Sequence, residues 1–375
     1  MQESASHLGA FHDWVELARR SHRLFDSGGR GPDPERLRAV LGLLAPPEDM
    51  RVREGRTWRR DGVDGREVSW WPGFGPRTRA WVLRPTGATE PLPGVLALHC
   101  HAGTKHIGRE RLADGPEGPA PTAVRLRGDL YADRAVADDL ARQGFTVLCH
   151  DAFSWGSRGF EAAAMPERVL RDAEAELAAR PGPPPGTAER YDAAARHHEH
   201  TLAKYCTLLG SSLAGMVARE DLLALDHLAA RPDVRADAIG CMGLSGGGWR
   251  ATLLHALDDR IGAGAVAAMM STFAQLSARH VDPHTWMLFP AGLSRECDWP
   301  ELAATRAPAP LLVQYAEQDH LFTPEGMRGA DAVLRARYAA ARHPSAYKGS
   351  FHPGGHALSA PMQREAAEWL HEHLG

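Results

Sequence analysis

The stretch Ile239-Gly-Cys-Met-Gly-Leu-Ser-Gly-Gly-Gly-Trp-Arg250 carries most of the structural information in this sequence. It places a G-x-S-x-G pattern, centred on Ser245, between an apolar run typical of a buried strand and an amphipathic helical run. A serine on such a sharp strand-to-helix turn has a strained backbone, so Gly243 and Gly247 must lack side chains. The following helix directs its first amides toward the same place, where they can stabilise a negatively charged oxygen. The pattern therefore predicts a nucleophilic serine.

Strand-like and helix-like segments alternate on both sides of this turn. Short, continuous apolar runs are separated by amphipathic helical runs from Pro93 onward. A buried parallel sheet with helices on both faces requires this alternation. The sequence therefore predicts an α/β fold with a doubly wound, mostly parallel sheet. The expected strands are Val95–His99, Thr146–Cys149, Ile239–Gly243, Ala263–Met269 and Leu311–Tyr315, and the expected helices include Ala135–Gln143, Leu222–Ala230, Trp249–Leu257 and Thr323–Tyr338.

The remaining segments suggest how the chain is organised. Residues 1–50 are expected to form a helical N-terminal extension with a glycine-rich break at Ser27–Gly31. Residues 51–84 alternate between apolar and polar positions, which indicates antiparallel strands at one edge of the sheet. Residues 154–216 combine a charged helical pattern, a Pro/Gly run and a histidine-rich piece. Because long insertions in compact domains tend to be functional, we expect residues 51–375 to form one α/β domain in which 154–216 can act as a lid.

Composition and charge argue against several classes of protein. The chain has 47 acidic and 43 basic residues, a net charge of −4 and no basic block, so nucleic acid is not an expected partner. No signal peptide or apolar segment of about 20 residues is present, which favours a cytoplasmic protein without membrane association. The five cysteines form no CxxC pair, so neither a disulfide framework nor a thiolate zinc site is indicated.

A serine nucleophile needs a base, and the base needs an orienting acid. In this fold the chain order is serine, acid, histidine. The run Pro310-Leu-Leu-Val-Gln-Tyr-Ala-Glu-Gln-Asp319 reads as a strand ending in a polar loop, which favours Asp319 as the acid with Glu317 as its competitor. The base is expected in the glycine-rich stretch before the last helix. There we favour His356 over His352, because two glycines precede His356 and a stiff proline follows His352.

The other expected site residues surround this triad. The backbone amide of His101, in the loop after the first parallel strand, and that of Gly246 are the expected oxyanion donors. Aromatic and apolar residues of the insertion and of Trp286–Trp299 are expected to wall the acyl pocket, because substrates in such sheets bind beyond the carboxyl ends of the strands. The aromatic residues expected to contact substrate are Trp155, Trp249, Trp286 and Phe289.

Taken together, these motifs resemble a known family. The runs His99–Glu110, His150–Arg158, G-L-S-G-G-G-W, the acid-bearing strand and G-G-H-A are similar to the dienelactone hydrolase and acetyl xylan esterase-like branch of the α/β-hydrolases. The resemblance covers Pro93 to the C-terminus. It implies a Ser245/Asp319/His356 triad, no cofactor and hydrolysis of an ester or lactone. Such relatives usually have His-Gly where this chain has His99-Cys100.

The sequence also bears on alternatives to a serine hydrolase. The histidine-rich groups His197–His200 and His371–His373 lack the spacing of H-E-x-x-H, so we interpret both as solvated helix surfaces with no metal. The same triad could also serve an acyltransferase, a lactone-forming cyclase or a thioesterase, or remain in a non-catalytic protein that only binds a ligand. The expected partner is a small-molecule ester or acyl compound, and the sequence leaves open a homo-oligomer.

Overall fold

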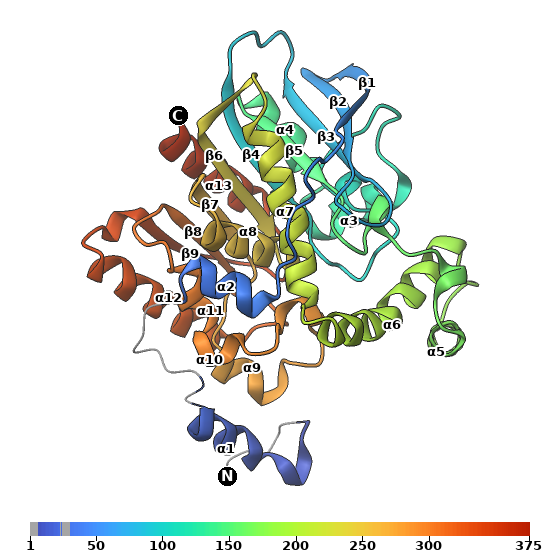
Figure 1. Cartoon of the computed structure of the whole chain (residues 1–375), viewed down its shortest axis with the longest axis vertical. Coiled ribbons are helices and arrows are strands. Elements are labelled where there is room, and N and C mark those ends of the chain that lie inside the picture. The colour runs from blue at the N-terminus through green and yellow to red at the C-terminus, as the bar shows by residue number, and fades with distance from the viewer. Residues whose placement is uncertain (1–6, 23, 25–30) are drawn as a thin grey trace.

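The computed structural model describes residues 7–22, 24 and 31–375, and its centre is a nine-stranded sheet (Figure 1). The strand order is β1-β2-β3-β5-β4-β6-β7-β8-β9. β1, β2, β3 and β5 pair antiparallel, whereas every pairing from β5 to β9 is parallel. The predicted mostly parallel sheet with an antiparallel N-terminal edge is therefore confirmed. The strands are β1 (Arg53–Arg60), β2 (Val63–Trp70), β3 (Thr78–Pro85), β4 (Leu92–Leu98), β5 (Thr146–His150), β6 (Val234–Leu244), β7 (Ile261–Ala267), β8 (Leu311–Ala316) and β9 (Tyr347–His352).

Helices cover both faces of this sheet, as the alternating sequence pattern predicts. In β4, Leu96 and Leu98 join the core under α7 (Leu213–Ala229) and α8 (Gly246–Leu257), while Val95 joins the core on the opposite face. That second core lies under α4 (Val136–Arg142) and α13 (Ala360–Leu374). Successive strand residues point to opposite faces, so a run that is apolar at every position fills two cores at once. The other helices of eight or more residues outside the insertion are α1 (Asp13–His22), α2 (Pro34–Leu41), α3 (Pro121–Leu130) and α12 (Pro324–Ala340).

The structure differs most from the expected elements at two places. β9 was not predicted, because its side chains are mostly half-buried and it lies at the edge of the sheet, so it has no apolar run to reveal it. The helix expected at Leu222–Ala230 begins earlier, at Leu213, where Ser212 caps its N-terminus by accepting a hydrogen bond from the amide of Gly215. The end of the expected insertion is therefore the first turn of α7, a helix of the central domain.

The N-terminal region contains the two expected helices. α2 begins after the capping residue Asp33 and buries Leu37 and Leu41 in the core beside α7 and α8. No residue of α1 is buried. Residues 27–30 of the expected break lie outside the described part of the chain.

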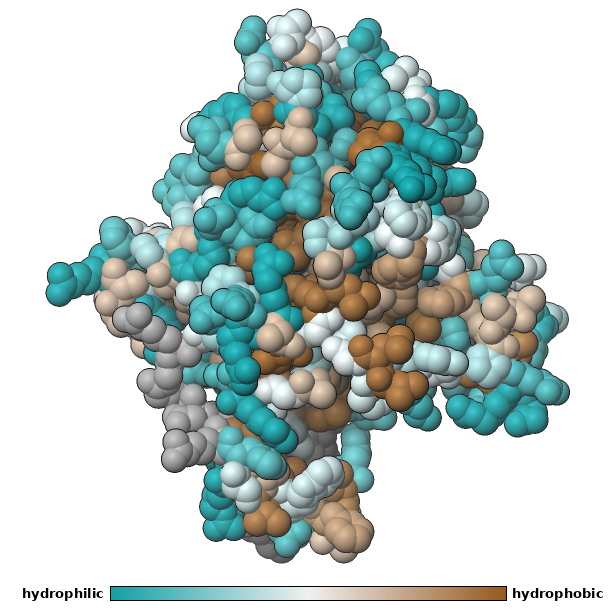
Figure 2. All heavy atoms as spheres, in the orientation of Figure 1, coloured by the Kyte–Doolittle hydropathy of each residue, from teal (hydrophilic) through white to brown (hydrophobic). Residues whose placement is uncertain are grey.

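The insertion forms a helical arm beside the carboxyl end of the sheet. α5 (Glu167–Ala178) and α6 (Thr187–Leu208) pack on each other through a small core of their own and extend from the body of the molecule (Figure 1). Hydrophilic residues cover most of the face in Figure 2, and hydrophobic ones gather near where α6 meets α7. At this end of α6, Leu208 and Leu209 are strongly exposed. Among the described residues, no helix has the length and apolar character that crossing a membrane requires.

A buried histidine of α8 gives a testable pH dependence. His255 is fully buried, and burial together with Arg306 lowers its pKa to about 3. An unfolded histidine takes up a proton near pH 6.5, so the free energy of unfolding decreases as the pH falls from that value toward 3. Replacing His255 by Leu removes this proton uptake. The loss of stability between pH 7 and pH 5 should therefore shrink by up to about 2 kcal/mol, as measured by denaturant titration.

The exposed His343 offers a matched control, since its replacement by Leu removes a histidine without touching the core. We expect the H343L variant to lose as much stability between the two pH values as the unsubstituted protein does. An equal loss in H255L would contradict this interpretation of His255.

Candidate active site

The turn at Ser245 has the strained geometry that the G-x-S-x-G pattern requires. Ser245 lies between β6 and α8 with φ 55° and ψ −122°, and its amide donates to the carbonyl of Ala267 at 2.8 Å. A Cβ atom on Gly243 would lie 2.3 Å from the backbone of Gly247, and one on Gly247 would lie 2.1 Å from the carbonyl oxygen of Leu98. Neither contact is sterically possible. The two glycines are therefore needed for the turn to pack against β4.

A carboxylate and an imidazole from two different loops meet beside this turn. Asp319 follows β8 and His356 follows β9, and Nδ1 of His356 lies 2.7 Å from Oδ2 of Asp319. The Asp319 side chain is fully buried, and its Oδ1 accepts the amide of Leu321 at 2.9 Å. The two loops are joined by backbone hydrogen bonds, for example from the amide of Gln318 to the carbonyl of Gly354. This arrangement fixes the orientation of the His356 ring.

The structure also distinguishes between the competing candidates for the acid and for the base. Glu317 is exposed, whereas Asp319 is buried against the histidine. His352 does not line the pocket of Ser245, and its Nε2 lies 2.8 Å from Oε2 of Glu365 on α13. The preferred residues, Asp319 and His356, are the ones that the structure brings together.

The predicted oxyanion donors lie next to each other. A Cβ atom on Gly246 would be 3.0 Å from the backbone nitrogen of His101, so the amides of both residues border the same space beside Ser245. The neighbouring amide of Cys100 is already engaged, because it donates to the hydroxyl of Tyr131. For the amides of His101 and Gly246 no acceptor is found within the described residues. Both therefore remain available to an oxygen of a ligand.

The loop that carries His101 is held by buried polar groups. Arg111, with no exposed surface, donates to the carbonyls of Cys100, His101 (3.0 Å), Thr104 and Ile107 (2.9 Å). A charged donor that satisfies four carbonyls at once leaves the loop few alternative conformations. The position of the His101 amide is thus set by the fold.

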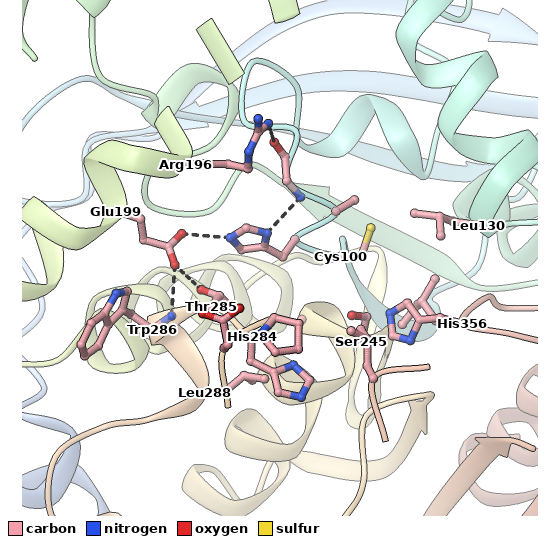
Figure 3. Close-up of a pocket in the computed structure, with 18 of the residues that line it drawn as sticks. Cys100, Leu130, Arg196, Glu199, Ser245, His284, Thr285, Trp286, Leu288 and His356 are labelled. Carbon is pink, nitrogen blue, oxygen red and sulfur yellow. Dashed lines mark hydrogen bonds and ion pairs between the residues drawn. The ribbon is translucent and has the colours of Figure 1, made fainter. Parts of the chain in front are cut away.

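A pocket of about 390 Å³ opens above these groups. Figure 3 shows Cys100 and Leu130 on the side of Ser245 and His356, and Arg196, Glu199 and Trp286 at the opposite end. The end beside Ser245 is therefore mostly apolar, whereas the other end is polar. The polar end is formed by α6 of the insertion and by residues 282–286, with the lining residues Arg196, Glu199, His200, Asp282, Pro283, His284, Thr285 and Trp286.

Of the four aromatic residues expected to contact substrate, only Trp286 lines this pocket, with 47% of its surface exposed. Trp155 is 1% exposed and packs behind the loop against His99, His101 and Lys105. Trp249 is fully buried in α8, where it contacts Trp299. Phe289 packs against Trp299 and His284, beside the pocket. Proximity in sequence to the motifs did not predict which aromatic residues line the pocket, because the ends of strands and the starts of helices also carry core residues.

The histidine-rich piece of α6 was also misinterpreted. His198 and Glu199 are buried, so this segment is not a solvated surface. Arg196, Glu199 and His200 all line the pocket, and their i, i+3, i+4 spacing on one helical face was the signal that the sequence offered. Within the part of the chain that the structure describes, no group of three or more His, Cys, Asp or Glu is arranged to hold a metal ion.

His284 is a further histidine of the pocket, and one that the sequence did not reveal. Burial, together with the neighbouring His356, lowers the pKa of His284 to about 4. Its ring stacks on Phe322, with the ring centres 5.0 Å apart. A neutral imidazole at this position can donate or accept a hydrogen bond from substrate at pH 7.

Comparison with known proteins places this site in a familiar fold. No family model matches the chain. A Bacillus subtilis (strain 168) protein named "Putative hydrolase YtaP" is 25% identical over 296 residues, which is 79% of this chain and 83% of that protein. A solved "putative acetyl xylan esterase" from Bacteroides fragilis NCTC 9343 has a TM-score of 0.67 at 16% identity, covering 92% of this chain and 82% of that one. A glucuronoyl esterase from Solibacter usitatus has a TM-score of 0.61 at 14% identity, covering 94% and 97%. The α/β-hydrolase fold, with its likeness to acetyl xylan esterases, is therefore confirmed.

The Asp319–His356 contact yields the second prediction. Asn at position 319 keeps the shape of the side chain but favours the wrong tautomer of the His356 ring and no longer stabilises its charged form. We expect Asp319→Asn to lower kcat for ester hydrolysis by about 10⁴-fold with little loss of stability, as measured by steady-state kinetics and thermal unfolding. The exposed Glu317 provides the matched control, and Glu317→Gln should change kcat less than about twofold. The opposite ranking would show that Asp319 is not the orienting acid.

Proposed function

We propose that this protein is a serine hydrolase that cleaves a carboxylic ester through an acyl-enzyme on Ser245. The observation that carries the proposal is the His356 ring, oriented by its 2.7 Å contact with Asp319 and lining the same pocket as the strained Ser245. A serine, a base and an orienting acid in this arrangement are the components of nucleophilic catalysis.

The proposed first step is the attack of the Ser245 hydroxyl oxygen on the ester carbonyl. His356 takes the hydroxyl proton on Nε2, because its Nδ1 faces Asp319. The carbonyl oxygen becomes an oxyanion, which the amides of His101 and Gly246 stabilise. When the tetrahedral intermediate collapses, the carbon–oxygen bond to the alcohol breaks and His356 returns the proton to the leaving alcohol.

Water completes the proposed cycle. It enters the space vacated by the alcohol, and His356 accepts one of its protons while the oxygen attacks the acyl carbonyl. The same two amides stabilise the oxyanion of the second tetrahedral intermediate. Its collapse releases the carboxylic acid and returns the proton to Ser245.

The two ends of the pocket favour a small acyl group on a polar alcohol. The space beside Ser245 is bordered by Leu130, Leu244 and Leu321, which suit a short apolar acyl chain. The polar end offers Arg196, His200 and other hydrogen-bonding groups to the alcohol. The names of the structurally similar proteins, acetyl xylan esterase and glucuronoyl esterase, also refer to esters of carbohydrates. We therefore propose acetylated sugars or similar polyols as the substrate class.

The identity of the nucleophile can be tested with a fluorophosphonate probe, whose phosphorus takes the place of the ester carbonyl carbon. We expect the probe to modify Ser245 alone, as located by peptide mapping, with turnover of p-nitrophenyl acetate falling in proportion to labelling. Ser245→Ala should abolish both. The control Ser277→Ala, whose hydroxyl bonds only within its own helix, should retain both. An adduct on another serine, or an active S245A protein, would refute the proposal.

The role of Trp286 gives a separate test of the substrate class. Its half-exposed ring at the polar end can cover one face of a sugar. Trp286→Ala should raise KM for acetylated xylo-oligosaccharides roughly tenfold, a loss of about 1.4 kcal/mol, and leave KM for p-nitrophenyl acetate nearly unchanged. The control is Trp14→Ala, because Trp14 is exposed on α1. Trp369 on α13 is buried, so replacing it would disturb the core. If W286A raises KM equally for both substrates, this end of the pocket does not bind the alcohol.

A further inference from the structure

A single buried carboxylate of the insertion connects three walls of the pocket. Glu199 lies on α6, and only 6% of its side chain is exposed. Its Oε2 is 2.9 Å from Nε2 of His101 and 2.6 Å from Nζ of Lys105. Its Oε1 accepts the hydroxyl of Thr285 and the amide of Trp286, the latter at 3.1 Å (Figure 3). The loop that carries His101 and Lys105, here called the oxyanion loop, is thus joined at one side chain to the helical insertion and to the 282–286 segment.

The charge on Glu199 is balanced inside the protein. Burial opposes its ionisation, but Lys105 and His101 hold the pKa of Glu199 well below its usual value. Lys105 is 1% exposed, donates to the Ser154 hydroxyl at 2.9 Å and lies 3.9 Å from the centre of the Trp155 ring. Two charges buried this deeply require each other, because either one alone would be left without solvation.

The His101 ring is held at both of its nitrogens. Nδ1 accepts the amide of Gly103 at 3.0 Å, so Nε2 carries the proton and donates it to Glu199. Burial lowers the pKa of His101, although Glu199 opposes that shift, and the ring therefore stays neutral. The ring and the proposed oxyanion amide belong to the same residue. A ring that cannot rotate restricts the peptide group that carries the amide.

We propose that Glu199 is a positioning residue for the oxyanion hole, acting through the His101 ring on the backbone amide of His101. This inference rests on the proposed function, because it assigns Glu199 a role in the same acyl transfer. It gives the insertion a part in the chemical step as well as in substrate binding. Glu199 does not contact the reacting atoms in this role.

Replacing Glu199 by Gln changes the chemistry of the site with little change in its size. The carboxylate accepts from four donors, on His101, Lys105, Thr285 and Trp286. A glutamine has a single acceptor oxygen, and its amino group would face at least one donor that cannot accept, such as the Lys105 ammonium or the Trp286 amide. The contacts on one side of the former carboxylate must therefore be lost.

The experiment compares the unsubstituted protein with E199Q on p-nitrophenyl acetate, an ester whose small alcohol does not need the polar end of the pocket. We expect kcat to fall at least about tenfold while KM changes less than about twofold, because a displaced donor weakens binding of the transition state. The inhibition constant of an aryl trifluoromethyl ketone, which forms a tetrahedral oxyanion on the serine, should rise by a similar factor. Glu174→Gln, which breaks the exposed ion pair of the same insertion with Arg190, should leave both values unchanged.

A purely structural role for Glu199 predicts a different result. Titration with the fluorophosphonate probe would then show a reduced active fraction, while the ketone would bind the remaining active protein normally. That outcome would overturn the proposal, as would an E199Q protein with normal kcat.

A second variant keeps the proposal testable if E199Q does not fold. His101→Ala removes the ring but retains the backbone amide and leaves the buried pair of Glu199 and Lys105 intact. We expect H101A to lower kcat and weaken ketone binding as E199Q does, and E199Q/H101A to lose no more than the more affected single variant. Unchanged kinetics in H101A, or additive losses in the double variant, would show that Glu199 does not act through the ring. An unsubstituted protein that hydrolyses no ester would instead overturn the proposed function.

Discussion

The close approach of β4, β6 and α8 at two glycines is the constraint on which the site depends. Gly243 and Gly247 let the backbone of the turn pass so near to β4 that no side chain fits between them. This contact produces the positive φ of Ser245 and brings Gly246 beside His101. The strain at one residue is maintained because the parallel strands around it are buried on both faces and cannot shift independently. The proposed nucleophile and the proposed oxyanion donors are consequently placed by the same packing.

Buried charges below the turn complete this framework. Asp221 on α7 accepts from Arg250 on α8 at 2.6 Å and lies 2.9 Å from the His150 ring at the end of β5. Arg250 also donates to the carbonyl of His99 at 3.2 Å, where the oxyanion loop begins. Such a cluster contributes little net stability, since desolvation offsets much of the attraction, but it permits few alternative arrangements of the four segments that it joins.

Much of the fold and of the candidate site could be predicted from the sequence. The apolar strand runs and the glycines around Ser245 reflect short-range requirements of the backbone, and Asp319 and His356 follow from the chain order that this fold imposes. The polar end of the pocket could not be predicted. Glu199 lies 98 positions from His101, and its burial depends on how the insertion folds back on the body. The prediction that Trp155 and Trp249 contact substrate was wrong for the converse reason, since an aromatic residue beside a motif can equally fill the core.

The contact of Glu199 on α6 with His101 of the oxyanion loop also bears on how this protein can evolve. Surface insertions usually vary freely, because they add function to a scaffold without disturbing it. Here Arg196 and His200, which line the pocket from α6, flank the Glu199 carboxylate, which contacts His101. With the positioning role proposed for Glu199, exchanging the whole insertion for that of a related fold would alter selectivity and rate together. On this proposal, new specificities are more accessible by point changes on either side of Glu199 than by recombination of intact segments, because the helical arm is bonded to the loop that it would have to leave.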